Sequence, residues 1–189
     1  MVTRSKTNLA AVAAFSLCVS SLSRGQEARQ KPEVTIGEMR IQTVPAMSYL
    51  CTSAETSFEE IGGTVRAGLD KVYSAATQNK LLLARPSMLV YWGNPHFDPK
   101  KTFKMEIGVV ISDDIRAIEG VTIRKTEPFK CAGILYIGTV KQQGQAYQKL
   151  IPALMEAGYV PTGEEREVCL NWEGAHSSNN IYWMQIGIK

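Results

Sequence analysis

The chain has 189 residues, 44% of them hydrophobic and 21% charged, an ordinary globular composition that excludes a fibrous or largely disordered protein. Its formal net charge of +3 comes from the first 25 residues, which hold Arg4, Lys6 and Arg24 and no acid, so the remainder is neutral. A nucleic-acid partner requires a surplus of cations, and we therefore expect none. We also expect no membrane span, because no apolar run reaches about 18 residues.

The N-terminal segment has the order of a secretory signal peptide. Its basic start is followed by an apolar stretch at residues 9–19 and then by small polar residues. Ser23 and Gly25 fit the positions that a signal peptidase reads, so we interpret residues 1–25 as a signal peptide that is cleaved near Gly25. Cleavage would place the protein in the periplasm or outside the cell. A buried N-terminal helix is the alternative.

After a polar lead at residues 26–33, hydrophobic periodicity predicts strands and one long helix in the first half of the chain. Ser57 and Glu60 form an S-x-x-E capping box, which is typical of a helix start. The predicted elements are an extended segment at 34–50, a helix at 58–78, a strand at 88–92, a loop at 93–101 and a strand at 103–111.

The second half repeats this order of elements. Gly158 is a suitable residue to end its helix. The predicted elements are extended segments at 121–124 and 129–137, a helix around 147–154, a strand at 167–172, a polar loop at 173–180 and a strand at 181–188.

Similar residues at a nearly constant spacing support an internal duplication with halves at about 34–112 and 121–189. The segment MEIGV at 105–109 matches MQIGI at 184–188 with a shift of 79, and TVP at 43–45 matches TEP at 126–128 with a shift of 83. We therefore predict an α+β fold of two pseudo-symmetric halves. Each half is an antiparallel sheet backed by one long helix, and a cleft lies at the centre.

Alternation along the strands separates a helix-covered face from a second face. Every second residue from Phe103 to Ile111, and from Tyr182 to Ile188, is apolar and is predicted to face the helices. When the shift of 79 is applied to the preceding strand, it predicts that Val168 faces the helices. The second face then collects Met88, Val90, Trp92, Lys104, Glu106, Glu167, Cys169, Asn171, Trp183 and Gln185.

Tryptophans and carboxylates on one face favour a small-molecule cleft, since soluble proteins rarely expose such a patch without a use. Carboxylates beside aromatic rings suit a cation or a polarised planar ligand. Alternatives without a binding site stay open. Glu167 could be an exposed strand acid, Glu106 could pair with Lys104 in solvent, and the tryptophans could serve only in packing. Tyr136 could point into the cleft or cap the helix start, and the sequence does not decide between the two.

Residues 33–189 resemble the GyrI-like small-molecule-binding domains, the effector-binding modules of bacterial multidrug and AraC-type regulators. The similar segments are 105–111 with the family's YEIGFPV, 131–138 with YAVFxHxG, 167–171 with EIYLN and 186–189 with LPVK. The resemblance implies a duplicated, saddle-shaped sheet that binds drugs or dyes, often cationic, with a buried glutamate as anion. Glu167 matches that glutamate, and Glu106 matches the other family glutamate.

Several positions depart from the family pattern. Cys169 and Gln185 stand where tyrosines are expected, and Trp183 stands where a glutamate is expected. The cleft therefore has one acid fewer and one indole more, so the family's ligands cannot be carried over. An export signal precedes the domain where a helix-turn-helix would stand, so we expect no regulator of transcription or of gyrase.

The remaining chemistry-bearing residues give no further site. His96 and His176 lie in polar loops without acids at ligand spacing, so we expect them to be solvated and predict no metal and no cofactor. The Glu164-Glu165 pair is interpreted as a solvated turn. Loss of Cys18 with the signal peptide leaves Cys51, Cys131 and Cys169, which allow at most one disulfide.

We therefore predict an exported, stand-alone binding protein, monomer or homodimer, for a small, flat organic molecule, with a positive charge as an open option. One alternative is a hydrolase of a reactive small molecule that uses the pocket glutamate, with Glu106 as its orienter. A second is tetrapyrrole binding, because the SOUL haem-binding proteins share the duplicated fold. The predicted face lacks a histidine for axial ligation, which disfavours that alternative.

Overall fold

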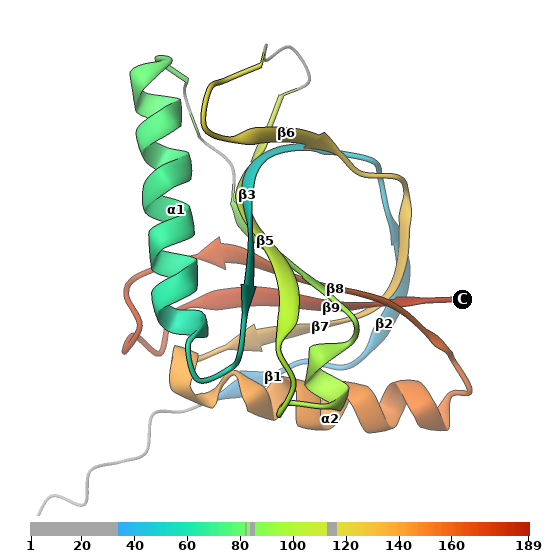
Figure 1. Ribbon diagram of the computed structural model, residues 1–189. Coiled ribbons are helices and arrows are strands. Elements are labelled where there is room, and N and C mark those ends of the chain that lie inside the picture. The colour runs from blue at the N-terminus through green and yellow to red at the C-terminus, as the bar shows by residue number, and fades with distance from the viewer. Residues whose placement is uncertain (1–33, 82, 84–85, 113–116) are drawn as a thin grey trace, which may run out of the picture. The chain divides into compact units, whose positions relative to one another are not determined.

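The computed structural model describes residues 34–189, except 82, 84–85 and 113–116. The predicted signal peptide at 1–25, its cleavage point near Gly25 and the polar lead at 26–33 lie outside the described residues. Within the described part, nine antiparallel strands form one sheet that carries two α-helices (Figure 1), so the α+β class is confirmed.

The elements follow the predicted order closely. The strands are β1 (Thr35–Ile36), β2 (Arg40–Val44), β3 (Ser48–Thr56), β4 (Ser87–Trp92), β5 (Phe103–Ile111), β6 (Thr122–Lys125), β7 (Phe129–Ile137), β8 (Pro161–Asn171) and β9 (Ile181–Ile188). The helices are α1 (Ile61–Gln78) and α2 (Gly144–Glu156), with short 3₁₀ turns η1 (Pro95–Phe97) and η2 (Val140–Gln142). The bounds of β5, β7 and β9 agree with the prediction to the residue.

Two predicted boundaries are wrong. The capping box does not form: α1 begins at Ile61 after Glu60, whose side chain makes no capping bond, and the Glu60 N–H binds the backbone carbonyl of Ser57 at 3.1 Å. Strand β8 begins at Pro161 rather than at residue 167, because its polar first half is paired with β4 and β9 inside the sheet. The helix end is as predicted, since Gly158 follows α2 with a φ of +77°.

The order of strands across the sheet is β1-β7-β9-β8-β4-β5-β3-β6, and β2 also pairs with β7. The central pair, β4 with β8, joins the two halves. The leading strands of the two halves are exchanged: β1 and β2 pair with β7 of the second half, and β6 pairs with β3 of the first half. Each half of the repeat therefore completes the sheet of the other.

The two connections that make this exchange contact one another. The backbone N–H of Thr126 donates to the Met47 carbonyl at 2.8 Å, and the Met47 N–H donates to the Thr126 hydroxyl at 3.0 Å. Figure 1 shows β3 and β6 arching over toward β2 and β7. The exchange thus curls the sheet and encloses one of its faces.

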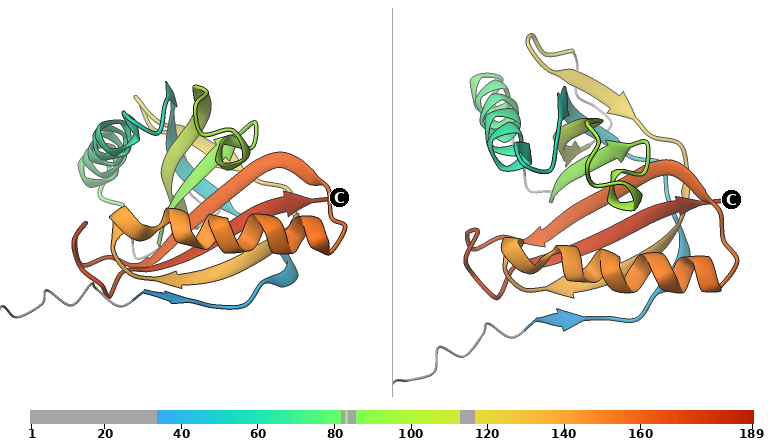
Figure 2. Two further views of the ribbon diagram at one scale, coloured as in Figure 1. Left: turned by 90° about the horizontal axis from the view of Figure 1, so that it is seen from below. Right: turned by 60° about the horizontal axis from the view of Figure 1, so that its bottom comes forward.

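Both helices cover the outer face of the curled sheet. Helix α1 packs on β3 and β5, and α2 packs on β7 (Figure 2). The predicted inward sets are confirmed there: Met105 and Ile107 are buried with residues of α1, and Met184 and Ile186 are buried with residues of α2. Gly68 lets α1 approach closely, since a Cβ there would lie 2.7 Å from the Ile107 side chain.

The inner face, enclosed by the curl, forms a second core without a helix. Its buried apolar residues are Val44, Tyr49, Cys51, Met88, Val90, Phe129, Cys131 and Val168. Gly108 and Gly187, the repeated glycines of the two halves, stand where backbones come close: an added Cβ would lie 2.3 Å from the Leu50 carbonyl or 3.1 Å from that of Glu164. The sheet therefore covers its own second face.

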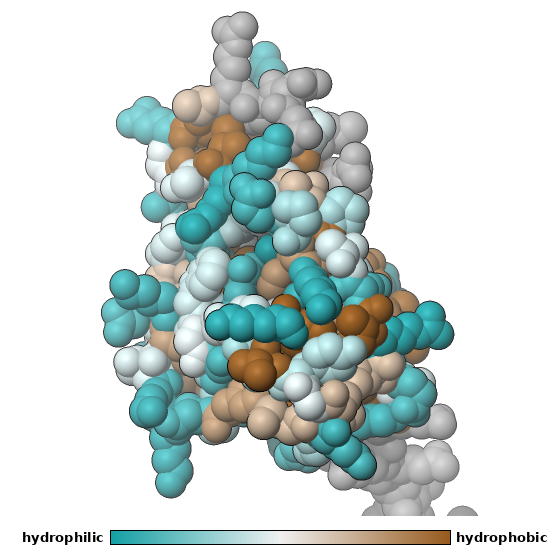
Figure 3. All heavy atoms as spheres, turned by 90° about the vertical axis from the view of Figure 1, so that its right-hand side faces the viewer, coloured by the Kyte–Doolittle hydropathy of each residue, from teal (hydrophilic) through white to brown (hydrophobic). Residues whose placement is uncertain are grey.

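The outer surface mixes charged and apolar residues. Figure 3 shows one side, where hydrophobic side chains gather in two places, near the top and in the lower half, among hydrophilic ones. No helix of the described residues is long and apolar enough to cross a membrane. The described cysteines, Cys51, Cys131 and Cys169, are all free thiols.

Candidate functional site

A cavity of about 650 Å³ lies on the helix-covered face, between the start of α1 and the length of α2. Its floor is the central strand pair, from which Tyr91 of β4 and Glu167 of β8 project. The loop between β4 and β5 closes one side. The lining residues are Phe58, Ile61, Tyr91, His96, Pro99, Val140, Gln143, Gly144, Tyr147, Gln148, Ile151, Pro152 and Glu167. We call this cavity the outer cleft.

Two buried carboxylates lie at the base of the outer cleft: Glu167 lines it, and Glu165 contacts the His96 side chain that lines it. Glu165 is 0% exposed and Glu167 is 5% exposed. They lie on the helix side because they pair with Ile186 and Met184 of β9, which face α2. The prediction that Glu165 belongs to a solvated turn is therefore wrong.

The carboxylate of Glu167 is held by donors from α2. The Tyr147 hydroxyl donates to its Oε1 at 3.0 Å, and the Gln143 amide donates to its Oε2 at 3.2 Å. Burial raises the pKa of Glu167, while His96 and the hydrogen bonds from Tyr147 and Tyr91 oppose that rise. Burial also raises the pKa of both tyrosines, so they remain neutral donors.

The imidazole of His96 fills part of the outer cleft, and the prediction that it is solvated is wrong. Its ring stacks on Tyr147 with centroids 3.4 Å apart and planes 8° apart, and the Tyr91 ring meets it edge-on at 5.3 Å. Its Nδ1 contacts Glu165, and its Nε2 lies 3.9 Å from Glu167. The side chain is only 12% exposed. The other histidine, His176, is exposed as expected.

The eight residues predicted for the site divide between the two faces of the sheet. Glu167 and Cys169 lie on the helix side, which corrects the prediction that they share a face with Trp183. Tyr136 is buried under α2, and its hydroxyl donates to the Thr139 carbonyl just before η2, away from the outer cleft. The other five lie on the inner face: Met88, Trp92, Glu106, Trp183 and Gln185.

The misplaced residues have one cause. The shift of 79 aligns Met105 with Met184. Their partners on the neighbouring strands, Tyr91 and Glu167, are only 76 residues apart in the sequence. The connection between the two strands is therefore longer in the second half by an odd number of residues, which inverts the faces of β8 relative to the prediction. By this register Glu167 corresponds to Tyr91, and both point into the outer cleft.

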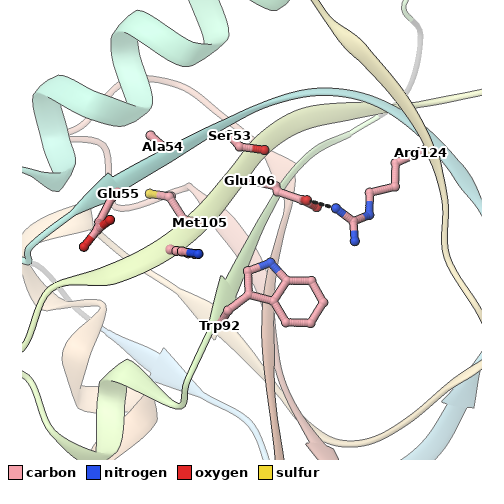
Figure 4. Close-up of a pocket in the computed structure, with 8 residues that line it drawn as sticks. Ser53, Ala54, Glu55, Trp92, Met105, Glu106 and Arg124 are labelled. Atoms are coloured by element: carbon pink, nitrogen blue, oxygen red, sulfur yellow. Dashed lines mark hydrogen bonds and ion pairs between the residues drawn. The ribbon is translucent and has the colours of Figure 1, made fainter.

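The inner face has its own cavity, of about 600 Å³, lined by Trp92, Glu106 and Arg124 among others (Figure 4). Here Glu106 is 4% exposed and contacts both the Arg124 guanidinium and the Tyr49 hydroxyl. Arg124 also lies over the Trp92 ring, 5.8 Å from its centroid. The residues that line this cavity include two acids, Glu55 and Glu106, and two bases, Lys104 and Arg124, so it offers no net negative charge to a ligand.

Sequence reasoning missed four residues of the outer cleft. Tyr91 and Tyr147 were not among the predicted site residues, and His96 and Glu165 were expected to be solvated. Glu165 and Glu167 share a parity along β8, so a longer predicted strand would have placed them together. Nothing in the local sequence of His96 indicates that its loop folds inward.

Comparison with known protein families identifies the family of this chain. The family model of the GyrI-like small-molecule-binding domain matches residues 37–186. No curated protein matches the chain.

Three solved structures share the fold. EcmrR, in a cryo-EM complex with DNA, is 12% identical with a TM-score of 0.62; the match covers 80% of this chain but only 57% of that one. SAV2435 bound to tetraphenylphosphonium is 13% identical with a TM-score of 0.59, covering 80% and 94%. A hydrolase encoded by lin2189 of Listeria innocua is 12% identical with a TM-score of 0.55, covering 81% and 92%. On the strength of the family match, the chain belongs to the GyrI-like small-molecule-binding family.

Proposed function

We propose that this protein binds a small, flat, cationic organic molecule in the outer cleft, with Glu167 as the counter-charge. The observation that carries the proposal is the charge of the cleft. Two buried carboxylates face one histidine at its floor, and no lysine or arginine is among the described residues that line it. A cation bound there would regain from the carboxylates the electrostatic stabilisation that it loses on leaving water.

The walls of the outer cleft support a planar ligand. Tyr91, Tyr147 and Phe58 present aromatic rings, and Ile61 and Ile151 add apolar surface. Aromatic faces attract cations through their quadrupole, and they exclude water from the ion pair. The binding of tetraphenylphosphonium, an organic cation, by the similar protein SAV2435 is consistent with this chemistry.

A titration with 1-methylquinolinium tests the proposal, with 1-methylnaphthalene as its uncharged analogue. We expect the cation to bind and the analogue to bind at least about tenfold more weakly. Glu167→Gln should remove that preference, because it removes the charge and keeps the shape. Glu106→Gln is the matched control on the inner face and should keep it. Equal affinity of Glu167→Gln and the wild type for the cation would refute the proposal.

We also propose that the protein is exported before it binds its ligand. The support is the sequence pattern of residues 1–25. Expression of the full chain in bacteria, followed by fractionation and N-terminal sequencing, would test it. A start near Gln26 in the periplasm or medium is expected, and an uncleaved chain in the cytoplasm would contradict it. Gel filtration of the mature protein would distinguish a monomer from a homodimer.

Hydrolysis is the second candidate function, favoured by His96 lying between two carboxylates. An imidazole held by Glu165 could accept a proton from water, while a protonated Glu167 donates one to a leaving group. Release of nitrophenolate from 4-nitrophenyl acetate is a simple assay for turnover. The hydrolase candidate requires a rate above that of the Glu167→Gln variant and of buffer. Tetrapyrrole binding has less support, because Nδ1 of His96 is engaged by Glu165 and its Nε2 faces Glu167.

A further inference from the structure

The His96 side chain already makes the contacts that the proposed ligand would make. It is a flat ring that can carry one positive charge, stacked on Tyr147 and met edge-on by Tyr91. Its two nitrogens face the two carboxylates of the cleft floor, Glu165 and Glu167. Phe58, from the turn before α1, closes over it with ring centroids 4.8 Å apart. The imidazole is therefore surrounded by the aromatic and acidic groups of the site.

The loop that carries His96 buries a polar atom without a partner. Asn94, at its start, has a φ of +54°, in the left-handed region that asparagine adopts more readily than most side chains. Its side-chain oxygen is buried and has no hydrogen-bond partner among the described residues. Release of the loop from the cleft would let water reach this oxygen and relieve that cost.

The backbone of this loop has few ties to the sheet. The N–H groups of Phe97, Asp98 and Lys101 donate to carbonyls of Asn94, Pro95 and Asp98, all within the loop itself. Lys101 also forms an ion pair with Asp98 at 2.6 Å. Gly93, at the edge of the loop, is the residue that donates to the neighbouring β8 region, at Gly163. The segment can therefore move outward as a unit without breaking these internal bonds.

We infer that the His96 imidazole is a built-in occupant of the ligand subsite, and that a cationic ring enters the outer cleft by displacing His96 together with its loop. The inference rests on the proposed function, because it assigns the same cleft to a cation. It narrows the ligand to compounds with a singly charged aromatic ring that can stack on Tyr147 as the imidazole does. A ring of this kind replaces both the stacking and the carboxylate contacts that His96 gives up.

Removal of the side chain is the first test. The variant His96→Gly leaves a space shaped for 4-methylimidazole, which is the free form of the histidine side chain. Below its own pKa this probe is charged, whereas 4-methylthiazole has nearly the same shape and is neutral. We expect His96→Gly to bind 4-methylimidazole at least about tenfold more tightly than the wild type and than 4-methylthiazole, as measured by calorimetry.

Two further variants control this result. His176→Gly removes the other, exposed histidine and should bind 4-methylimidazole no better than the wild type. The double variant His96→Gly with Glu167→Gln should lose the gain, because the vacated space then has one carboxylate fewer. If His96→Gly binds 4-methylimidazole no better than the wild type, or binds 4-methylthiazole equally well, the inference is overturned.

A second measurement needs no variant and stays informative if His96→Gly fails to fold. Lys100 and Lys101 are exposed at the end of the loop and are sites for trypsin. We expect saturating 1-methylquinolinium to increase the rate of cleavage at these lysines, because it displaces the loop. An unchanged or slower rate, with 1-methylquinolinium bound, would overturn the displacement.

The two proposals fail in different ways. If neither the wild type nor His96→Gly binds 1-methylquinolinium or tetraphenylphosphonium, the proposed function fails and the inference falls with it. If the wild type binds 1-methylquinolinium through Glu167 but His96→Gly gains nothing and trypsin cleavage does not rise, only the displacement of His96 fails.

Discussion

At the scale of single residues, the buried negative charge of Glu167 in the outer cleft lowers the stability of the folded state. Burial raises the pKa of Glu167, so the folded state holds its proton more tightly than the unfolded state does. The stabilisation linked to that proton is complete below the ordinary pKa of a glutamate. It is lost as the pH rises through the raised pKa, at about 1.4 kcal/mol per unit by which the pKa is raised.

The variant Glu167→Gln should therefore be more stable than the wild type at neutral pH. Glutamine keeps the shape and has no charge to bury: its oxygen accepts from Tyr147, and its NH₂ group donates to the Gln143 amide oxygen once that amide turns over. We expect its melting temperature to exceed that of the wild type at neutral pH, and the difference to disappear at a pH below the ordinary glutamate pKa. A difference that is constant with pH would show that the carboxylate is not the source.

The same protonation should control ligand affinity. A protonated Glu167 offers no negative charge, so the affinity for 1-methylquinolinium should fall as the pH drops through the raised pKa of this residue. The quinolinium charge is permanent, and the probe itself does not titrate. Titrations across acidic pH should show this decline in the wild type and a flat profile in Glu167→Gln. A flat profile in both proteins would argue against Glu167 as the counter-charge.

The residue scale is also where prediction from sequence failed most. The family resemblance pointed to Glu167, and the structure places that residue in a cavity of the helix face. Strand alternation, in contrast, grouped it with Trp183, because the odd difference in connection length reverses the parity of β8. The position of His96 depends on a loop that folds back on distant side chains, which no local pattern encodes.

At the scale of elements, prediction was best where one face of a strand is wholly apolar. Strands β5 and β9 have such faces, and their predicted bounds match the structure. Strand β8 begins earlier than predicted because buried Glu165 and Arg166 interrupt its apolar pattern. Alternation of apolar and polar residues identifies a strand that packs on an apolar core, but it does not identify a strand that lines a polar cleft.

Two glycines of α1 give a sharp test of how this helix is seated. Gly68 faces Ile107 at close range, whereas a Cβ on Gly63 would meet nothing within 4 Å. Gly68→Ala should lower the free energy of unfolding by about 1–3 kcal/mol through overpacking. Gly63→Ala should raise it by about 0.5–1 kcal/mol through helix propensity. Urea denaturation of both variants checks the opposite signs, and two stabilising alanines would mean that α1 lies further from β5.

At the scale of the whole molecule, the duplication was predictable but the exchange of edge strands was not. The repeated MEIGV and MQIGI segments reveal two similar halves. Which half each edge strand joins depends on pairings between residues far apart in the chain, such as β2 with β7. Local sequence patterns do not specify such long-range pairings.

The crossing of the two connections should make unfolding of the two halves cooperative. Thr126→Val removes the hydroxyl that accepts the Met47 N–H and keeps the side-chain shape. We expect a loss of about 1–3 kcal/mol, with both halves still melting in a single transition. Thr43→Val, at the equivalent and exposed position of the first half, should change stability by less than about 0.5 kcal/mol. Equal effects of the two variants would argue against a special role for the crossing.

The exchanged strands also bear on how the fold could arise and be divided. In a single half, β2 or β6 would lack the strand of the other half with which it pairs. It would then extend past its own sheet as an arm. Two identical halves would satisfy one another's arms reciprocally, as in a domain-swapped dimer. The chain has the topology of such a dimer joined head to tail, and a half expressed alone would be expected to restore it by self-association.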